Sequence, residues 1–166
     1  RLPFCGTIGD MVGERGDLAL IVPAKDADWA ARANKLKAKH WPKAEILTDA
    51  QALKRGVKGK SVVVLGSVKE NRWLKEHFPD IPVKVLSGGI RLLRRRRPFT
   101  LFKEPVDWVS VAQNPEDKAQ GLLIVAGAAL ARGLERLPGK ADFVVESLGR
   151  RLKTGAYDKT RKWDVQ

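Results

Sequence analysis

The chain has 166 residues and a formal net charge of +13, from 32 Lys and Arg against 19 Asp and Glu. A chain of this length buries enough apolar surface to fold without covalent staples. Its single cysteine, Cys5, excludes an internal disulfide and a cysteine-rich metal site, and the lack of an apolar run of about 18 residues predicts no transmembrane segment.

The first predicted elements alternate between strand and helix, as in α/β proteins. Residues 1–16 are rich in Gly and are predicted to be an irregular lead, and residues 18–22 form a continuous apolar run typical of a strand buried on both faces. Asp26 is placed as the N-cap of a helix that Pro42 ends. This helix is amphipathic: Trp29, Ala33 and Leu36 mark its core face, and Arg32, Lys35 and Lys39 mark a basic face.

Further strands and helices alternate after this helix. The pattern predicts a strand at 44–48, a short helical turn at 50–56, a strand at 61–65 and a helix at 67–78. Strands that alternate with helices indicate right-handed crossovers and a parallel sheet covered on both faces.

The pattern changes from residue 82 onward. Short strands around the turn at 87–89 and in 97–105, then a strand at 107–113 that stops at the turn 114–117, predict an antiparallel extension over 82–112. A strand at 121–126, a helix at 128–137, a strand at 142–146 and a hairpin around Leu148-Gly149 follow. Residues 159–166 are a basic tail with Lys159, Arg161 and Lys162.

These elements predict one α/β domain over residues 1–166. We expect a three-layer, flavodoxin-like, mainly parallel sheet with the antiparallel extension and the C-terminal hairpin. Because the chain begins at Arg1 rather than Met, we interpret it as a processed product or a part of a longer protein.

The stretch VVVLGSVKEN, residues 62–71, joins a strand to a helix. Ser67 and Glu70 fit a capping box, and Gly66 fits the tight turn, which leaves Asn71 without a structural reason. The alternative is a contact to a small anion or a sugar, because ligands bind at the carboxyl edge of parallel sheets. Gly66, Ser67, Glu70 and Asn71 are therefore the candidate ligand-binding residues, although neither common phosphate-loop motif is present.

Four consecutive arginines form the most basic stretch, and no acid occurs between Ile81 and Lys103. They either form a patch for an anionic partner or lie in a solvated hairpin tip. Together with the basic helix face, the candidate patch comprises Arg94, Arg95, Arg96, Arg97, Arg32, Lys35 and Lys39.

Catalytic constellations are not found. His40 and His77 lie near predicted helix ends, where capping or packing is typical, and Cys5 has no identifiable base. Asp107, Glu116 and Asp117 show no paired spacing. We therefore predict no catalytic residues, metal ligands or cofactor. The five tryptophans favour core packing over stacking on sugars: Trp29, Trp41, Trp73, Trp108 and Trp163.

Three blocks carry a resemblance. Their sequences are VVVLGSVKENRWLKEHFPDIPVKV, DWVSVAQNPEDKAQGLLIVAG and ADFVVESLGRRLKTGAYD. They lie within residues 60–158 and resemble the accessory α/β domain appended to secreted bacterial multidomain esterases and peptidases. The resemblance implies an exported, non-catalytic module that belongs to a parent chain whose catalytic residues lie elsewhere. Residues 94–97 depart from that pattern.

Three functions are compatible with these observations. The first is a non-enzymatic interaction module of a larger chain or assembly, whose basic surface binds a polyanion such as nucleic acid or acidic polysaccharide. The second is a nucleic-acid-binding protein, and the third is a small hydrolase or transferase with a site at Gly66-Ser67. A basic surface that only maintains solubility is the alternative to all binding interpretations of the charge.

Overall fold

A computed structural model describes residues 2–77, 83–86, 89–94, 97–102, 107–126, 133–147, 150–159 and 164–165. The first half contains α1 (Ile8–Val12), β1 (Leu18–Val22), α2 (Ala27–His40), β2 (Glu45–Thr48), α3 (Asp49–Arg55), β3 (Ser61–Leu65) and α4 (Arg72–His77). The second half contains β4 (Val83–Leu86), β5 (Gly89–Arg94), β6 (Arg97–Phe102), β7 (Asp107–Asn114), β8 (Asp117–Ala126), a 3-10 turn (Leu134–Arg136), β9 (Phe143–Ser147), β10 (Arg150–Gly155), β11 (Tyr157–Asp158) and β12 (Asp164–Val165).

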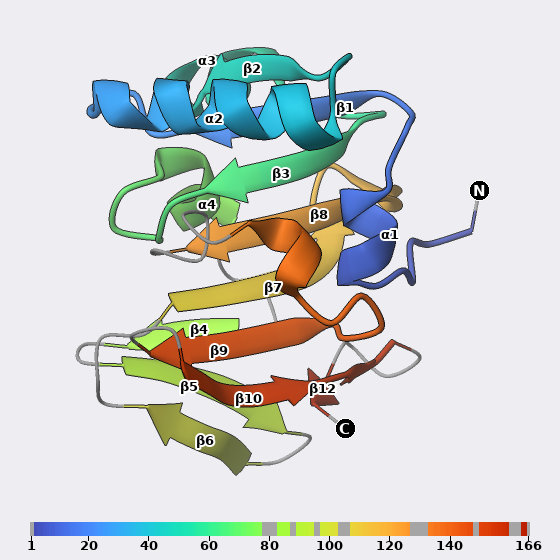
Figure 1. Cartoon of the computed structure of the whole chain (residues 1–166), viewed down its shortest axis with the longest axis vertical. Helices are drawn as coiled ribbons and strands as arrows, with labels where there is room; N and C mark the ends of the chain where they lie inside the picture. The colour runs from blue at the N-terminus through green and yellow to red at the C-terminus, as the bar shows by residue number, and fades with distance from the viewer. Residues whose placement is uncertain are drawn as a thin grey trace.

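The main sheet is mixed, and the chain has an α/β fold. Its seven strands follow the order β10-β9-β7-β8-β3-β1-β2 (Figure 1). The strands β8, β3, β1 and β2 are parallel, whereas β8, β7, β9 and β10 pair antiparallel. The parallel half was expected, and the second half is antiparallel because β7 and β8 are joined by a two-residue turn that reverses the chain.

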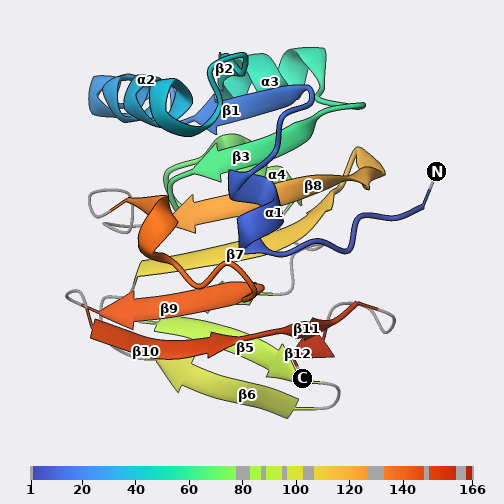
Figure 2. The same cartoon turned by 45° about the vertical axis from the view of Figure 1, so that its right-hand side comes forward.

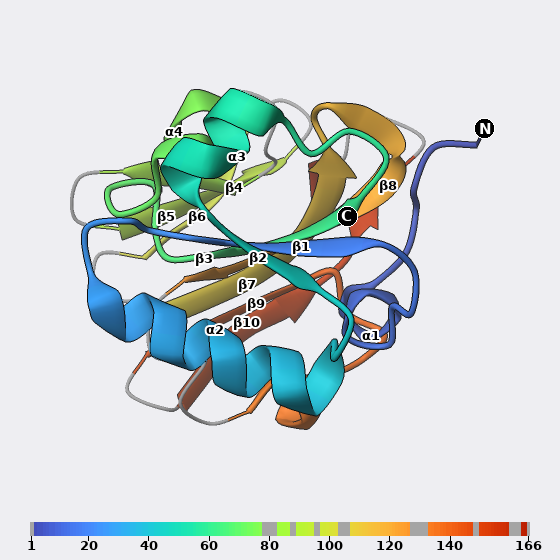
Figure 3. The ribbon, with the colours of Figure 1, turned by 90° about the horizontal axis from the view of Figure 1, so that it is seen from above.

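Helices lie on both sides of the parallel half. Seen from above, α2 and α1 lie on one side of the strands, and α3 and α4 lie on the other (Figure 3). The buried side chains of α2 are Trp29, Ala33 and Leu36, which confirms the predicted core face, and Asp26 caps the helix through the amide of Asp28.

The predicted antiparallel extension is divided between two sheets. The strands β4, β5 and β6 form a separate three-stranded sheet, whereas β7 belongs to the main sheet. The small sheet lies beside β9 and β10 at the end of the molecule opposite α2 (Figures 1 and 2). The C-terminal hairpin is confirmed, since Ser147 pairs with Arg150.

Three predicted elements need correction. The lead is not irregular throughout, because Thr7 and Asp10 form a capping box that begins α1, and this helix buries Ile8 and Met11. The expected helix at 67–78 begins only at Arg72, after a turn at 68–70, and Phe78 lies outside the described residues. Of the helix expected at 128–137, residues 128–132 are also outside them, and 134–136 form the 3-10 turn.

Candidate functional site

The Gly66-Ser67 turn lies at the carboxyl edge of the parallel strands. Gly66 has a φ of 99°, and a Cβ atom there would lie 3.2 Å from the ring of Pro23, which explains the glycine. The Gly66 amide donates to the carbonyl of Val125 at 2.9 Å. The Ser67 amide donates to Glu70 Oε1 at 3.2 Å, one half of the predicted capping box, while the Glu70 amide donates to the Ser67 carbonyl.

Asn71 has the structural reason that sequence reasoning missed. It is fully buried, and its Nδ2 donates to the carbonyls of Ile21 at 3.3 Å and Leu65 at 3.1 Å. Its Oδ1 accepts from the Leu74 amide at 3.1 Å, so the same side chain caps α4. Asn71 thereby joins the ends of β1 and β3 to the helix that follows.

Asp49 is a second buried polar residue at this edge, and sequence reasoning overlooked it. Its carboxylate accepts from the amides of Ala24 at 3.1 Å, Ala50 at 2.9 Å and Arg72 at 2.8 Å. One side chain therefore ties the loop after β1 and the first residue of α4 to the start of α3. The available signal was an acid directly after a strand, at the first position of a helix with a Thr48 capping box.

The basic face of α2 is exposed to solvent. Arg32 and Lys35 are exposed, and the Arg32 guanidinium lies 4.8 Å from the ring centroid of Trp29. Lys39 lies on the same helix but forms an ion pair with Glu135. Among the described residues, Arg32 and Lys35 form no ion pair, and they are the available cations of this face.

The arginine run lies far from α2. Arg94 and Arg97 are register partners at the ends of β5 and β6, and Arg95 and Arg96 lie outside the described residues. The small sheet lies beside β9 and β10, at the end of the molecule opposite α2, so the two regions lie at opposite ends of the molecule (Figures 1 and 2). The predicted patch is therefore two separate basic regions.

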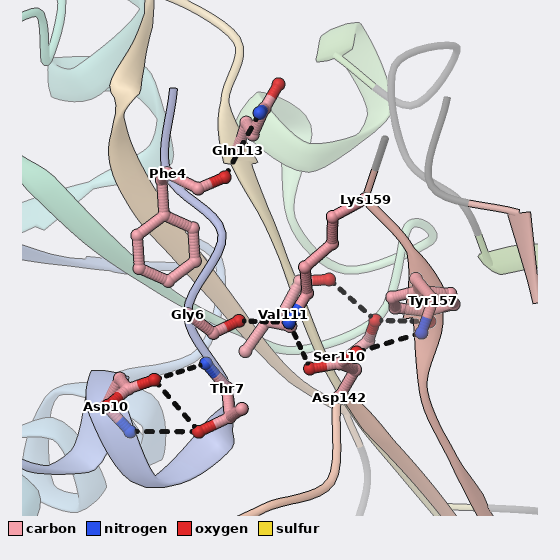
Figure 4. A network of polar contacts seen from close by, with 10 residues as sticks. All are labelled: Phe4, Gly6, Thr7, Asp10, Ser110, Val111, Gln113, Asp142, Tyr157 and Lys159. Carbon is pink, nitrogen blue, oxygen red and sulfur yellow. Dashed lines mark hydrogen bonds and ion pairs between the residues drawn. The ribbon is translucent and has the colours of Figure 1, made fainter. Parts of the chain in front are cut away.

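A buried polar network joins the two ends of the chain (Figure 4). Asp142 accepts from the Tyr157 amide at 2.8 Å and from Lys159 Nζ at 2.7 Å, and Lys159 also donates to the Gly6 carbonyl. The hydroxyls of Ser110 and Tyr157 are 2.7 Å apart. Burial raises the pKa of Tyr157 far above its ordinary value, so this phenol stays protonated and serves structure rather than proton transfer.

The remaining candidates have structural surroundings. Four tryptophans, Trp29, Trp41, Trp73 and Trp108, are buried, which confirms core packing, and Trp163 lies outside the described residues. Glu116 accepts from the Val57 amide and from the Trp73 indole, and Asp117 accepts from the Gly59 amide. His77 packs on Trp73, and Cys5 is exposed.

His40 is the buried titratable group at the end of α2. Only 9% of its side chain is exposed, and within the described residues its Nε2 has no hydrogen-bond partner, with Glu135 Oε2 at 3.7 Å. Burial lowers the pKa of His40 below its ordinary value of 6.5, against the raising effect of the Glu135 carboxylate. The Lys39 and Arg15 cations lower it further.

We expect a pH dependence of stability from His40. In the unfolded chain His40 takes up a proton as the pH falls through about 6.5, whereas its lowered pKa disfavours that proton in the folded chain. The stability of the folded state is therefore fully present above that pH and decreases as the pH falls. In urea unfolding at about pH 8 and about pH 5, the His40→Gln variant should lose less stability on acidification than the natural chain. Parallel losses in the two proteins would show that His40 does not contribute.

Comparisons with known proteins name no family for this chain. No protein-family model matches it, and no curated protein matches it significantly. In the described part, no three His, Cys, Asp or Glu side chains are grouped so that they could hold a metal ion. None of the described helices has the length and apolar character needed to cross a membrane.

Proposed function

We propose that this chain is a non-enzymatic interaction module that binds an anionic partner through the exposed cations of α2. The proposal rests on a difference between acidic side chains, which bond within the protein, and two basic side chains of α2, which are exposed to solvent. Asp49, Asp142 and Glu116 are tied to backbone amides or to Lys159, whereas Arg32 and Lys35 project from the surface without an ion pair among the described residues. With a net charge of +13, this leaves positive potential at the surface.

The hydrogen bonds at the carboxyl edge support a non-enzymatic role. The groups that would face a ligand there, the amides of Gly66 and Ser67 and the side chain of Asn71, already bond to the protein. A hydrolase or transferase centred on Ser67 would need these groups to be free. We therefore place binding on the helix surface and not at this turn.

The exposed side chains indicate which type of partner fits this surface. Among the described residues, Leu2 and Leu53 are the large hydrophobics that are exposed, so an apolar docking face is not offered there. The buried tryptophans provide no stacking platform for single-stranded nucleic acid or sugars. An acidic polysaccharide or acidic protein surface, recognised by charge, fits these features best.

We further propose a flavodoxin-like arrangement for the parallel half and an accessory role in a longer, exported chain. The order β2-β1-β3 reverses the direction of strand addition between β1 and β3, as in doubly wound sheets. The resemblance of residues 60–158 to accessory domains of secreted hydrolases supports the second part. A protein partner or the parent chain would then present the anionic surface.

The test compares polyanions and charge variants. We expect heparin binding to weaken several-fold in Arg32→Gln/Lys35→Gln, because two contacts and their counterion release are lost, and the slope of log affinity against log salt to fall by up to about 2. Lys58→Gln/Lys118→Gln removes the same charge from two other exposed positions and is the matched control.

The outcomes separate the alternatives. Equal losses in both double variants would mean that only net charge matters and that α2 is no binding face. Duplex DNA that displaces heparin at equal charge concentration would instead favour the nucleic-acid-binding alternative.

A further inference from the structure

A hollow of about 120 Å³ lies at the amino ends of β1 and β2, next to the end of α2. It is at the edge of the sheet opposite the Gly66-Ser67 turn. Its lining comes from the segment that leads into β1, up to the first strand residue Leu18, and from the segment between α2 and β2. The hollow is close in size to a cavity that holds one benzene ring, about 150 Å³.

The hollow combines an apolar wall with cations. Leu18, Trp41 and Ala44 are core residues that also line it, so an apolar body placed there would contact apolar side chains on one side. Arg15 and Lys43, which also line it, are both exposed. An apolar ligand with one negative charge matches this combination.

Arg15 is held in place by one end of its guanidinium. Its Nη1 donates to the carbonyls of Glu14 at 3.1 Å and His40 at 3.3 Å, which anchors the group to two segments. In the described part of the chain, Nε and Nη2 make no hydrogen bond. These atoms form the fork that binds a carboxylate through two parallel hydrogen bonds.

Glu14, the one acidic residue in the lining, repels a bound anion only weakly. Glu14 Oε1 accepts from the amides of Arg15 at 2.8 Å and Gly16 at 2.7 Å, and Oε2 accepts from the Ser61 hydroxyl at 3.2 Å. Its carboxylate is thus turned onto its own loop. Arg15 and Lys43 together leave the lining with a net positive charge.

We propose that this hollow binds a small organic carboxylate, with a compact apolar or aromatic body against Trp41 and Leu18 and the carboxylate on Arg15, assisted by Lys43. This site is independent of the polyanion contact on α2, since none of its lining residues belongs to that face. It also differs from the sheet edge at which α/β proteins usually bind ligands.

The test is a titration of the whole chain with benzoate, followed by the amide and indole signals in two-dimensional NMR. We expect saturable shifts of the Arg15, Gly16 and Lys43 amides and of the Trp41 indole, with a Kd on the order of 1 mM for so small a ligand. Benzyl alcohol, which keeps the ring without the charge, and acetate, which keeps the charge without the ring, should each bind at least about fivefold more weakly.

Variants show whether the fork binds the carboxylate. Arg15→Lys keeps the charge and loses the fork, and Lys43→Gln leaves the Arg15 anchor intact; both should weaken benzoate binding, while Arg32→Gln/Lys35→Gln should not. Benzyl alcohol binding as tightly as benzoate, unchanged affinity in both site variants, or shifts confined to α2 would overturn the proposal. The heparin result bears only on the α2 face, so the two proposals fail separately.

Discussion

Replacing Asp142 by Asn should lower the free energy of unfolding by about 3 kcal/mol. The Asp142 side chain is 3% exposed and that of Lys159 is 17% exposed, so the variant leaves an ammonium group in a poorly hydrated place without its carboxylate. The same carboxylate holds the Tyr157 amide and, through Lys159, the Gly6 carbonyl (Figure 4). The change therefore weakens the attachment of both chain ends to β7 and β9.

Urea unfolding of a double-mutant cycle measures this effect. Lys159→Met should also destabilise, and the double variant should lose less than the sum of the two single losses, because neither charge of this pair is then left without the other. Glu135→Gln breaks the Lys39–Glu135 pair, whose side chains are more than half exposed and screened by water, and should change stability far less than Asp142→Asn. Equal losses at Asp142 and Glu135 would contradict the buried-pair argument.

Replacing Asn71 by Ala should cost about 3 kcal/mol, because buried groups lose their partners. The carbonyls of Ile21 and Leu65 lose the donor that ties β1 to β3, and the amide of Leu74 loses the cap of α4. The substitution also leaves a small cavity at a position with no exposed surface. The loss should appear as a lower urea midpoint with an unchanged slope.

Asn34→Ala is the matched control for Asn71→Ala. Asn34 is exposed on α2, and its Nδ2 donates only to the carbonyl of Ala30 one turn earlier, among the hydrogen bonds formed in the described residues. Because Ala has the higher helix propensity, this variant should be neutral or more stable by up to about 0.5 kcal/mol. A similar loss at both positions would mean that the Asn71 contacts contribute little.

Local signals predicted the elements whose neighbours in sequence are also their neighbours in space. The strands at 18–22 and 61–65 follow from continuous apolar runs, and α2 follows from the Asp26 cap and the spacing of Trp29, Ala33 and Leu36. The short α1 was missed, because its five residues carry little periodicity and Asp10 takes the capping role that Glu or Gln usually has.

The candidate site was predicted less well, because long-range hydrogen bonds decide it. Asn71 looked free for a ligand since its partners Ile21 and Leu65 lie 50 and 6 residues away. Asp49 was overlooked for the same reason: its position after a strand and at the start of a helix is visible in the sequence, but its partners Ala24 and Arg72 lie 25 and 23 residues away. The hollow beside Arg15 arises between two segments that are distant in sequence, and no motif marks it.

The sequence by itself determined the α/β class, the positions of the parallel strands and the basic face of α2, because these depend on apolar runs, caps and helical spacing within one element. Only the tertiary structure decided the antiparallel half of the sheet, the separation of Arg94 and Arg97 from Arg32 and Lys35, and the use of Asp49 and Asn71 to tie strand ends to helix starts. Strand order and loop packing bring together residues that share no local pattern, and their contacts set which polar groups remain available for a partner.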